Sequence, residues 1–189
     1  MNTQFTPHAS GIIAIELISL GEDTWWLAAL SAHDESKQQL LLWELTYNEI
    51  SLMAVAAVPT RENTTLRFNP SNPNELVSNS TKSVIFWLYD AQHLSCYIPR
   101  LSRRRFKRQI KTLADFTKSC FLPGTSQAVT ATSDGYLFLW DARSAELDFF
   151  DDLEDEQQID GKDNKTKIDE KIAVKLVRVS QKAINFLST

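Results

Sequence analysis

The sequence predicts an all-β fold with about three rounds of four antiparallel strands, followed by the first strand of a fourth round. The stretch Gln127 to Asp141, QAVTATSDGYLFLWD, places two runs rich in Val, Thr, Tyr, Phe and Trp around an Asp-Gly pair, which is a strong signal for a β-hairpin. Trp43, Trp87 and Trp140 each follow an apolar pair and recur at intervals of 44 and 53 residues. Four-stranded repeat units recur at about 40–45 residues, so the three tryptophans indicate three such units.

The expected strands are apolar runs that end at Gly, Pro, Asn or polar residues. The first round is expected at Gly11 to Leu20, Trp25 to Leu30, Leu40 to Glu44 and Ile50 to Val58. A helix is an alternative for the last of these ranges, because the periodicity of a short apolar run does not distinguish a strand from a helix. The later rounds are expected at Thr65 to Phe68, Glu75 to Asn79, Val84 to Trp87, Tyr97 to Ile98, Ser119 to Leu122, Ala128 to Thr132, Tyr136 to Trp140, Val174 to Val179 and Ala183 to Leu187.

The central hairpin resembles a blade of the WD-repeat family of β-propellers. In that family the second strand ends in hydroxyl residues, as at Thr132, an Asp lies at the turn, as at Asp134, and the third strand ends in Trp-Asp, as at Trp140-Asp141. Trp87 and Trp43 stand at the same place in weaker copies of the motif. The resemblance implies a partial WD-repeat β-propeller whose structural blade residues are Thr132, Asp134, Trp140, Asp141, Trp87 and Trp43.

The expected organisation is a single partial propeller over residues 1–189. Its parts are blade 1 at about 11–59, blade 2 at about 64–99, a basic connector at 100–118, blade 3 at about 119–179 with an acidic insertion at 143–171, and the start of blade 4 at about 183–189.

A narrower resemblance comes from the order of segments. FNPSNPNELVSNSTKSVIFW, from Phe68 to Trp87, is followed by the basic connector and then by the central hairpin. This order is similar to the WD-repeat proteins of cilia and flagella found at the radial-spoke base, in the calmodulin- and spoke-associated complex. The resemblance implies a non-enzymatic interaction scaffold of the axoneme that supports motility, with axonemal or radial-spoke subunits as partners. The alternative is a cytoplasmic peptide-binding adaptor of another complex, of ubiquitin-ligase or chromatin type.

Composition narrows the possible environments and partners. The net charge of −4 gives no global basic field for nucleic acid. The chain has two cysteines, Cys96 and Cys120, and no second pair of cysteines, so neither a disulfide framework nor a zinc site is expected. No basic leader segment and no apolar run of ~18 residues occurs, so we expect an intracellular, reducing compartment and no membrane partner.

The stretch after Pro99, RLSRRRFKRQIK, is the most basic part of the chain, and Phe106, Ile110 and Leu113 fall at helical spacing around it. Three interpretations stay open: a solvated connector, a contact with an acidic protein surface such as a microtubule or a calmodulin-like partner, or binding to nucleic acid phosphates. Nucleic acid is the least favoured, since no stacking aromatics accompany the charges. The candidate partner-binding residues are Arg100, Arg103, Arg104, Arg105, Lys107, Arg108 and Lys111.

No pattern in the sequence indicates catalysis or a resident cofactor. The acidic residues between Glu146 and Asp160 suggest calcium, but with Gly161 at the sixth loop position the twelfth is Lys167, so the bidentate Glu of an EF-hand is missing. Two interpretations of this acidic stretch stay open: it is a solvated insertion, or it holds divalent ions loosely. His8, His33 and His93 are scattered, and we expect no enzyme, no metal and no cofactor.

Overall fold

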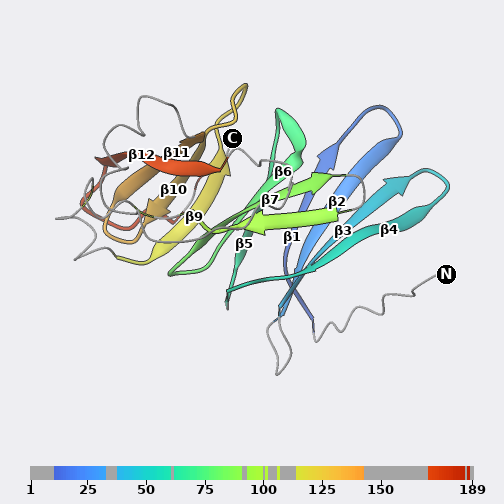
Figure 1. The fold of residues 1–189 in the computed structure, drawn as a ribbon, viewed down its shortest axis with the longest axis horizontal. Helices are drawn as coiled ribbons and strands as arrows, with labels where there is room; N and C mark the ends of the chain where they lie inside the picture. Colours follow the sequence, from blue (N-terminus) through green and yellow to red (C-terminus); the bar gives the residue numbers. More distant parts are fainter. Residues whose placement is uncertain are drawn as a thin grey trace, which may run out of the picture.

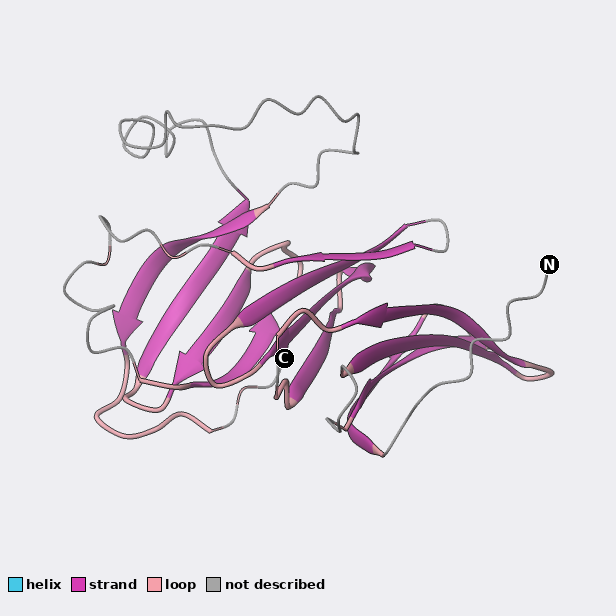
Figure 2. Cartoon of the chain, turned by 60° about the horizontal axis from the view of Figure 1, so that its bottom comes forward, coloured by secondary structure: helices cyan, strands magenta, loops and turns pink. Residues whose placement is uncertain are grey.

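Three four-stranded antiparallel sheets follow one another along the chain (Figure 1). The computed structural model describes residues 11–32, 38–60, 62–90, 93–99, 101, 106, 114–142, 170–185 and 187. These residues contain no helix (Figure 2). The prediction of an all-β chain with three four-stranded antiparallel sheets is therefore confirmed.

Each sheet is a meander in which neighbouring strands are also neighbours in sequence. Sheet 1 contains β1 (Ile12–Ser19), β2 (Thr24–Ser31), β3 (Gln39–Thr46) and β4 (Ile50–Ala57). Sheet 2 contains β5 (Thr65–Asn69), β6 (Asn72–Asn79), β7 (Val84–Asp90) and β8 (His93–Tyr97). Sheet 3 contains β9 (Phe116–Phe121), β10 (Ala128–Thr132), β11 (Tyr136–Ala142) and β12 (Lys171–Arg178).

The apolar core lies between successive sheets. One cluster joins Ala28, Leu40 and Leu42 of sheet 1 to Leu76 and Trp87 of sheet 2. Since side chains alternate between the two faces of a strand, sheet 2 uses its two faces for two different neighbours.

A second cluster joins the other face of sheet 2 to sheet 3. It contains Val77 and Phe86 from sheet 2 and Phe138 and Trp140 from sheet 3. Phe106, from the expected basic connector, is buried in this cluster and packs edge-to-face on Phe138 with ring centroids 6.0 Å apart. Sheet 2 is thus apolar on both faces, which is typical of a sheet covered on both sides.

The turn between β10 and β11 explains why the central hairpin forms as expected. Gly135 has a φ of 86°, in the left-handed region that glycine adopts without strain. Its carbonyl accepts hydrogen bonds from the amides of Val179 (3.0 Å) and Ser180 (3.2 Å). The chain after β12 therefore runs directly across this turn.

Some boundaries differ from the expected ranges. Residues 50–57 form a strand and not the alternative helix. Strand β12 begins at Lys171, the last residue assigned to the acidic insertion, because Lys171 and Ile172 pair with Ala142 and Asp141. Strand β9 begins inside the range assigned to the connector.

The expected first strand of a fourth round is not formed within residues 183–185 and 187. Instead, the amide of Ile184 donates to the carbonyl of Thr132 (3.4 Å), and its carbonyl accepts a hydrogen bond from Thr117 Oγ1. This short segment therefore contacts the end of sheet 3.

Candidate functional site

Trp87 is held by a buried polar chain that joins sheet 2 to sheet 1. Its indole Nε1–H donates to Ser78 Oγ at 2.9 Å, and Ser78 Oγ donates to Asn63 Oδ1 at 3.2 Å. The backbone amide of Asn63 in turn donates to Gln38 Oε1 (3.0 Å), and Gln38 Nε2 donates to the carbonyl of Asn63 (2.8 Å). All four side chains are buried. Because each donor has an acceptor, the network can be buried without leaving these groups unsatisfied.

Trp140 makes the equivalent contact in sheet 3. Its Nε1–H donates to Thr130 Oγ1 at 2.8 Å, and Thr130 Oγ1 is hydrogen-bonded to Ser119 Oγ, also at 2.8 Å. In both sheets the acceptor lies two residues beyond the cross-strand partner of the tryptophan, which is Leu76 for Trp87 and Ala128 for Trp140. Sheets 2 and 3 therefore use the same indole-to-hydroxyl anchor.

The expected motif residues divide into two separate contacts. Thr132 Oγ1 donates to Asp134 Oδ1 at 2.5 Å and accepts from the amide of Tyr136 at 2.9 Å, so both residues stabilise the turn. Asp141 accepts a hydrogen bond from Gln127 Nε2 (2.7 Å). Neither Thr132 nor Asp134 bonds to the tryptophan, and the acceptors that do, Ser78 and Thr130, were not among the predicted residues. The sequence signal that could have found these acceptors is a hydroxyl residue nine residues before Trp87 and ten residues before Trp140.

Trp43 lacks this anchor. Its cross-strand partner is Leu27, so the position equivalent to Ser78 and Thr130 is Ala29, which has no hydroxyl. Within the described residues, the indole of Trp43 makes no hydrogen bond and the side chain is only half-buried. Trp43 also lies on the face of sheet 1 opposite the one that packs on sheet 2, because Leu40 and Leu42 occupy the shared cluster.

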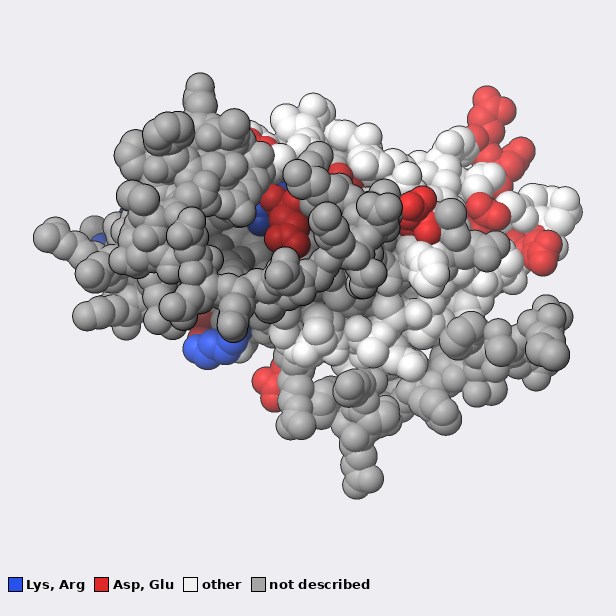
Figure 3. All heavy atoms as spheres, viewed as in Figure 1, with Lys and Arg blue, Asp and Glu red and all other residues white. Residues whose placement is uncertain are grey.

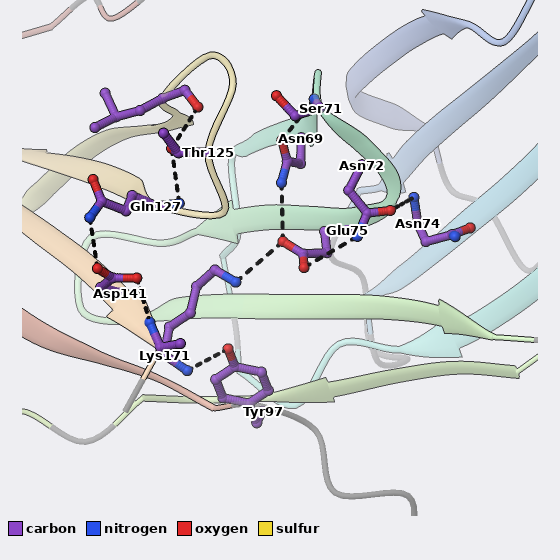
Figure 4. Close-up of polar contacts among 12 residues, drawn as sticks. Asn69, Ser71, Asn72, Asn74, Glu75, Tyr97, Thr125, Gln127, Asp141 and Lys171 are labelled. Carbon is purple, nitrogen blue, oxygen red and sulfur yellow. Dashed lines mark hydrogen bonds and ion pairs between the residues drawn. The ribbon is translucent and has the colours of Figure 1, made fainter. Parts of the chain in front are cut away.

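Lys171 and Glu75 form a mostly buried ion pair between sheets 3 and 2 (Figure 4). The distance from Lys171 Nζ to Glu75 Oε2 is 3.2 Å, and the two side chains are only 7% and 21% exposed. Glu75 Oε2 also accepts from Asn69 Nδ2 (3.2 Å), and Glu75 Oε1 accepts from Asn72 Nδ2 (3.4 Å). These amide donors compensate part of the cost of removing the carboxylate from water.

Aromatic rings complete the surroundings of Lys171. Its Nζ lies 5.6 Å from the ring centroid of Phe86 and 6.0 Å from that of Phe121, within the range of cation–π attraction. The backbone amide of Lys171 donates to the hydroxyl of Tyr97 at 2.8 Å (Figure 4). The cluster is built from β6, β7, β8, β9 and β12, and it ties sheet 3 to sheet 2.

A further ion pair joins Arg67 of sheet 2 to Glu16 of sheet 1. Burial raises the pKa of Glu16 above its usual value, and the neighbouring Arg67 opposes this shift only in part. Burial also raises the pKa values of Cys96 and Cys120, which are free thiols. A thiol with a raised pKa carries little of the nucleophilic thiolate at neutral pH.

The charged candidates from the sequence all lie outside the described residues. Those candidates are the basic residues Arg100, Arg103, Arg104, Arg105, Lys107, Arg108 and Lys111, and the acidic residues between Glu146 and Asp160. Among the described parts, acidic side chains gather over the hairpin ends of sheet 1 (Figure 3). Residues 11–32 and 38–58 contain five carboxylates and no Lys or Arg.

The described residues contain neither a candidate metal-ligand cluster nor a candidate membrane-spanning helix. No group of three or more His, Cys, Asp or Glu side chains among the described residues could hold a metal ion. In the same part of the chain there is no helix long and apolar enough to cross a bilayer. His93 lies exposed on β8, and His8 and His33 fall outside the described ranges.

The fold and its contacts define an all-β protein of stacked, blade-like four-stranded sheets. No protein-family model matches the chain. The chain is similar to cilia- and flagella-associated protein 251 of Chlamydomonas reinhardtii, with 30% identity over 200 residues that cover 97% of this chain and 22% of the relative. The protein of that name from Pongo abelii is 30% identical over 71% of this chain, and the one from Tetrahymena thermophila is 25% identical over 74%. The chain spans less than a quarter of the length of each of these relatives.

These comparisons correct the family suggested by the sequence. The assignment to WD-repeat proteins of the radial-spoke base is wrong, because no WD-repeat family model matches and the relatives carry the name cilia- and flagella-associated protein 251. The structure gives a physical reason. Thr132 and Asp134 bond to each other within the turn, whereas Trp140 bonds to Thr130, so the expected motif residues do not form one network.

Proposed function

We propose that this chain is a non-enzymatic interaction scaffold that acts in the cilium or flagellum as a structural component of the axoneme. The observation that carries the proposal is the similarity to cilia- and flagella-associated protein 251 from distant organisms, which extends over 97% of the chain for the Chlamydomonas relative. Its direct partners are other proteins of the axoneme.

The contacts in the structure agree with a scaffold role. The buried polar groups at Trp87 and Trp140 are satisfied within their own sheets, and Lys171 of sheet 3 is satisfied by Glu75 of sheet 2. These groups therefore stabilise the stack and are not left as convergent donors for a substrate. Among the described side chains, Gln39 Oε1 is the one buried polar atom without a hydrogen-bond partner. Binding is therefore expected at outer faces and exposed segments.

Co-sedimentation of the purified chain with demembranated axonemes tests the proposal. We expect saturable pelleting with axonemes, and no pelleting without them. A chain that stays in the supernatant at all axoneme concentrations would contradict an axonemal scaffold.

The basic residues Arg103, Arg104 and Arg105 are the proposed contact with an acidic protein surface such as tubulin. Replacing all three by Glu is expected to weaken axoneme binding by at least about tenfold, and added salt is expected to weaken binding of the unmodified chain, because such contacts are screened. Lys162, Lys165 and Lys167 replaced by Glu form the matched control, with the same change in net charge. Equal losses for both triple variants would show that only net charge matters.

A further inference from the structure

The interface between sheets 2 and 3 contains its own lysine. Glu75 of β6 pairs with Lys171 of β12, and the ammonium group of Lys171 lies over the rings of Phe86 and Phe121. A carboxylate and aromatic rings together form a favourable environment for an ammonium group. This interface therefore shows the surroundings that the molecule provides for a lysine side chain.

The position in sheet 1 that corresponds to Glu75 follows from the strand register. Glu75 lies one residue before the cross-strand partner of Trp87. In sheet 1, the residue one position before the cross-strand partner of Trp43 is Trp26. The side chain of Trp26 packs on the apolar cluster between sheets 1 and 2. Trp26 therefore takes the place of Glu75 at the interface between sheets 1 and 2.

The position in sheet 2 that corresponds to Lys171 is found in the same way. Lys171 pairs with the residue two positions after Trp140. The residue two positions after Trp87 is Tyr89, and its cross-strand partner is Leu94. The interface between sheets 1 and 2 thus has an aromatic ring and an apolar leucine where the other interface has its lysine.

Trp26, Tyr89 and Glu44 lie together at this position and form what we call the Trp26 group. The rings of Trp26 and Tyr89 pack edge-to-face, with centroids 5.3 Å apart and an interplanar angle of 85°. The indole Nε1–H of Trp26 donates to Glu44 Oε1 at 3.3 Å. All three residues are partly buried, so each keeps an exposed part. Two aromatic rings and a carboxylate are therefore available to the same ligand.

The described part of sheet 1 has no cation to offer this carboxylate. Residues 11–32 and 38–58 contain five carboxylates and no Lys or Arg. Glu22, Asp23 and Glu49 lie exposed in the turns at the same end of the sheet as the Trp26 group (Figure 3). Their charges add to that of the group and attract a cation from outside the molecule.

We propose that the Trp26 group binds the ammonium group of a lysine side chain from a partner protein, as the other interface binds Lys171. Glu44 supplies the opposite charge, and the rings of Trp26 and Tyr89 supply cation–π attraction. The partner is a protein segment that presents an exposed lysine. The inference does not depend on the ciliary role or on the basic residues of the proposed axoneme contact.

Titration of the full chain with Nα-acetyl-lysine amide, at constant pH and ionic strength, tests the proposal. The NMR signal of Trp26 Nε1–H reports binding, and Trp26→Phe assigns that signal. The neutral Nα-acetyl-norleucine amide, which lacks the ammonium group, is the control probe. We expect a saturable shift with the lysine probe and at least about tenfold weaker binding of the norleucine probe. No shift with the lysine probe, or equal affinity for both probes, would overturn the proposal.

Substitutions test the carboxylate of the group separately from the net charge of the chain. Glu44→Gln keeps an acceptor for the indole and removes the charge, so we expect the affinity for the lysine probe to fall by about fivefold or more. Glu49→Gln is the matched control, because Glu49 is exposed at the same end of the sheet and the change in net charge is identical. Equal losses in the two variants would contradict a specific role for Glu44.

The ring of Tyr89 is tested by a second pair of variants. Tyr89→Phe keeps the ring and should bind the lysine probe like the unmodified chain, whereas Tyr89→Leu should bind it several-fold more weakly. Circular dichroism and melting curves establish that each variant folds. Full affinity in Tyr89→Leu would overturn the proposed aromatic contact.

Discussion

Ser78 and Thr130 are the residues that fix the tryptophans between the sheets. Ser78 is fully buried and bonds to both Trp87 and Asn63. Ser78→Ala should therefore lower the free energy of unfolding by about 1–3 kcal/mol, because a buried donor and a buried acceptor lose their partner together. Denaturant unfolding measures the loss.

Ser95→Ala is the matched control for Ser78→Ala, because Ser95 lies exposed on the same sheet and bonds only to the carbonyl of Leu88. We expect this control to change stability by less than about 0.5 kcal/mol. Equal effects of the two substitutions would rule out the anchoring role of Ser78.

Lys171 is the second residue on which the packing of sheet 3 depends. Lys171→Met leaves the carboxylate of Glu75 without its cation, and we expect a loss on the order of 3 kcal/mol. Glu75→Gln in the same chain should recover part of that loss, since the remaining uncharged amide tolerates burial better. An additive result for the two substitutions would show that the pair is not coupled.

Glu16 makes stability depend on pH in a direction that its raised pKa determines. The folded state binds the proton of Glu16 more tightly than the unfolded chain does. The stability that protonated Glu16 contributes is therefore complete below the ordinary pKa of 4.5 and is lost as pH rises through the folded-state pKa. The unmodified chain should thus lose stability relative to Glu16→Gln between a pH below 4.5 and neutral pH. Unfolding curves at both pH values measure this difference, and an opposite trend would mean that Arg67 dominates over burial.

At the scale of the element, the β10–β11 hairpin depends on Gly135. A Cβ there would overlap the backbone carbonyl of Ser180, and the φ of 86° is itself strained for other residues. Gly135→Ala should cost on the order of 2–3 kcal/mol. Gly21→Ala in the β1–β2 turn is the control, because no atom lies within 4 Å of a Cβ there. Melting temperatures that fall equally in both variants would contradict this account.

Most strands could be predicted from the sequence, because runs such as Val84 to Trp87 combine strand-forming residues with clear turn signals at their ends. The start of β12 could not. Lys171 falls in the range expected for the acidic insertion, but its place in the sheet is determined by Glu75, Phe86 and Tyr97, which are 74 or more residues away.

The candidate site was predicted less well, for a related reason. The sequence singled out the tryptophans as repeated positions, but the register between β10 and β11 decides which hydroxyl meets the indole of Trp140. That register selects Thr130 and leaves Thr132 in the turn. The hairpin, the spacing of the tryptophans and the order of segments also suggested a family, and comparison over 97% of the chain corrected it.

For the whole molecule, stability comes from interfaces between sheets, since the two apolar clusters lie between sheets 1 and 2 and between sheets 2 and 3. The stability of the whole molecule therefore depends on the contacts that each sheet makes with its neighbours.

The localisation of this chain in ciliated cells of its source organism tests the central claim most directly. We predict that a tagged chain lies along the cilium and that most of it stays with the axoneme after the membrane is removed by detergent. A chain that is absent from cilia, or that detergent releases completely, would contradict the proposal that it is a structural scaffold of the axoneme.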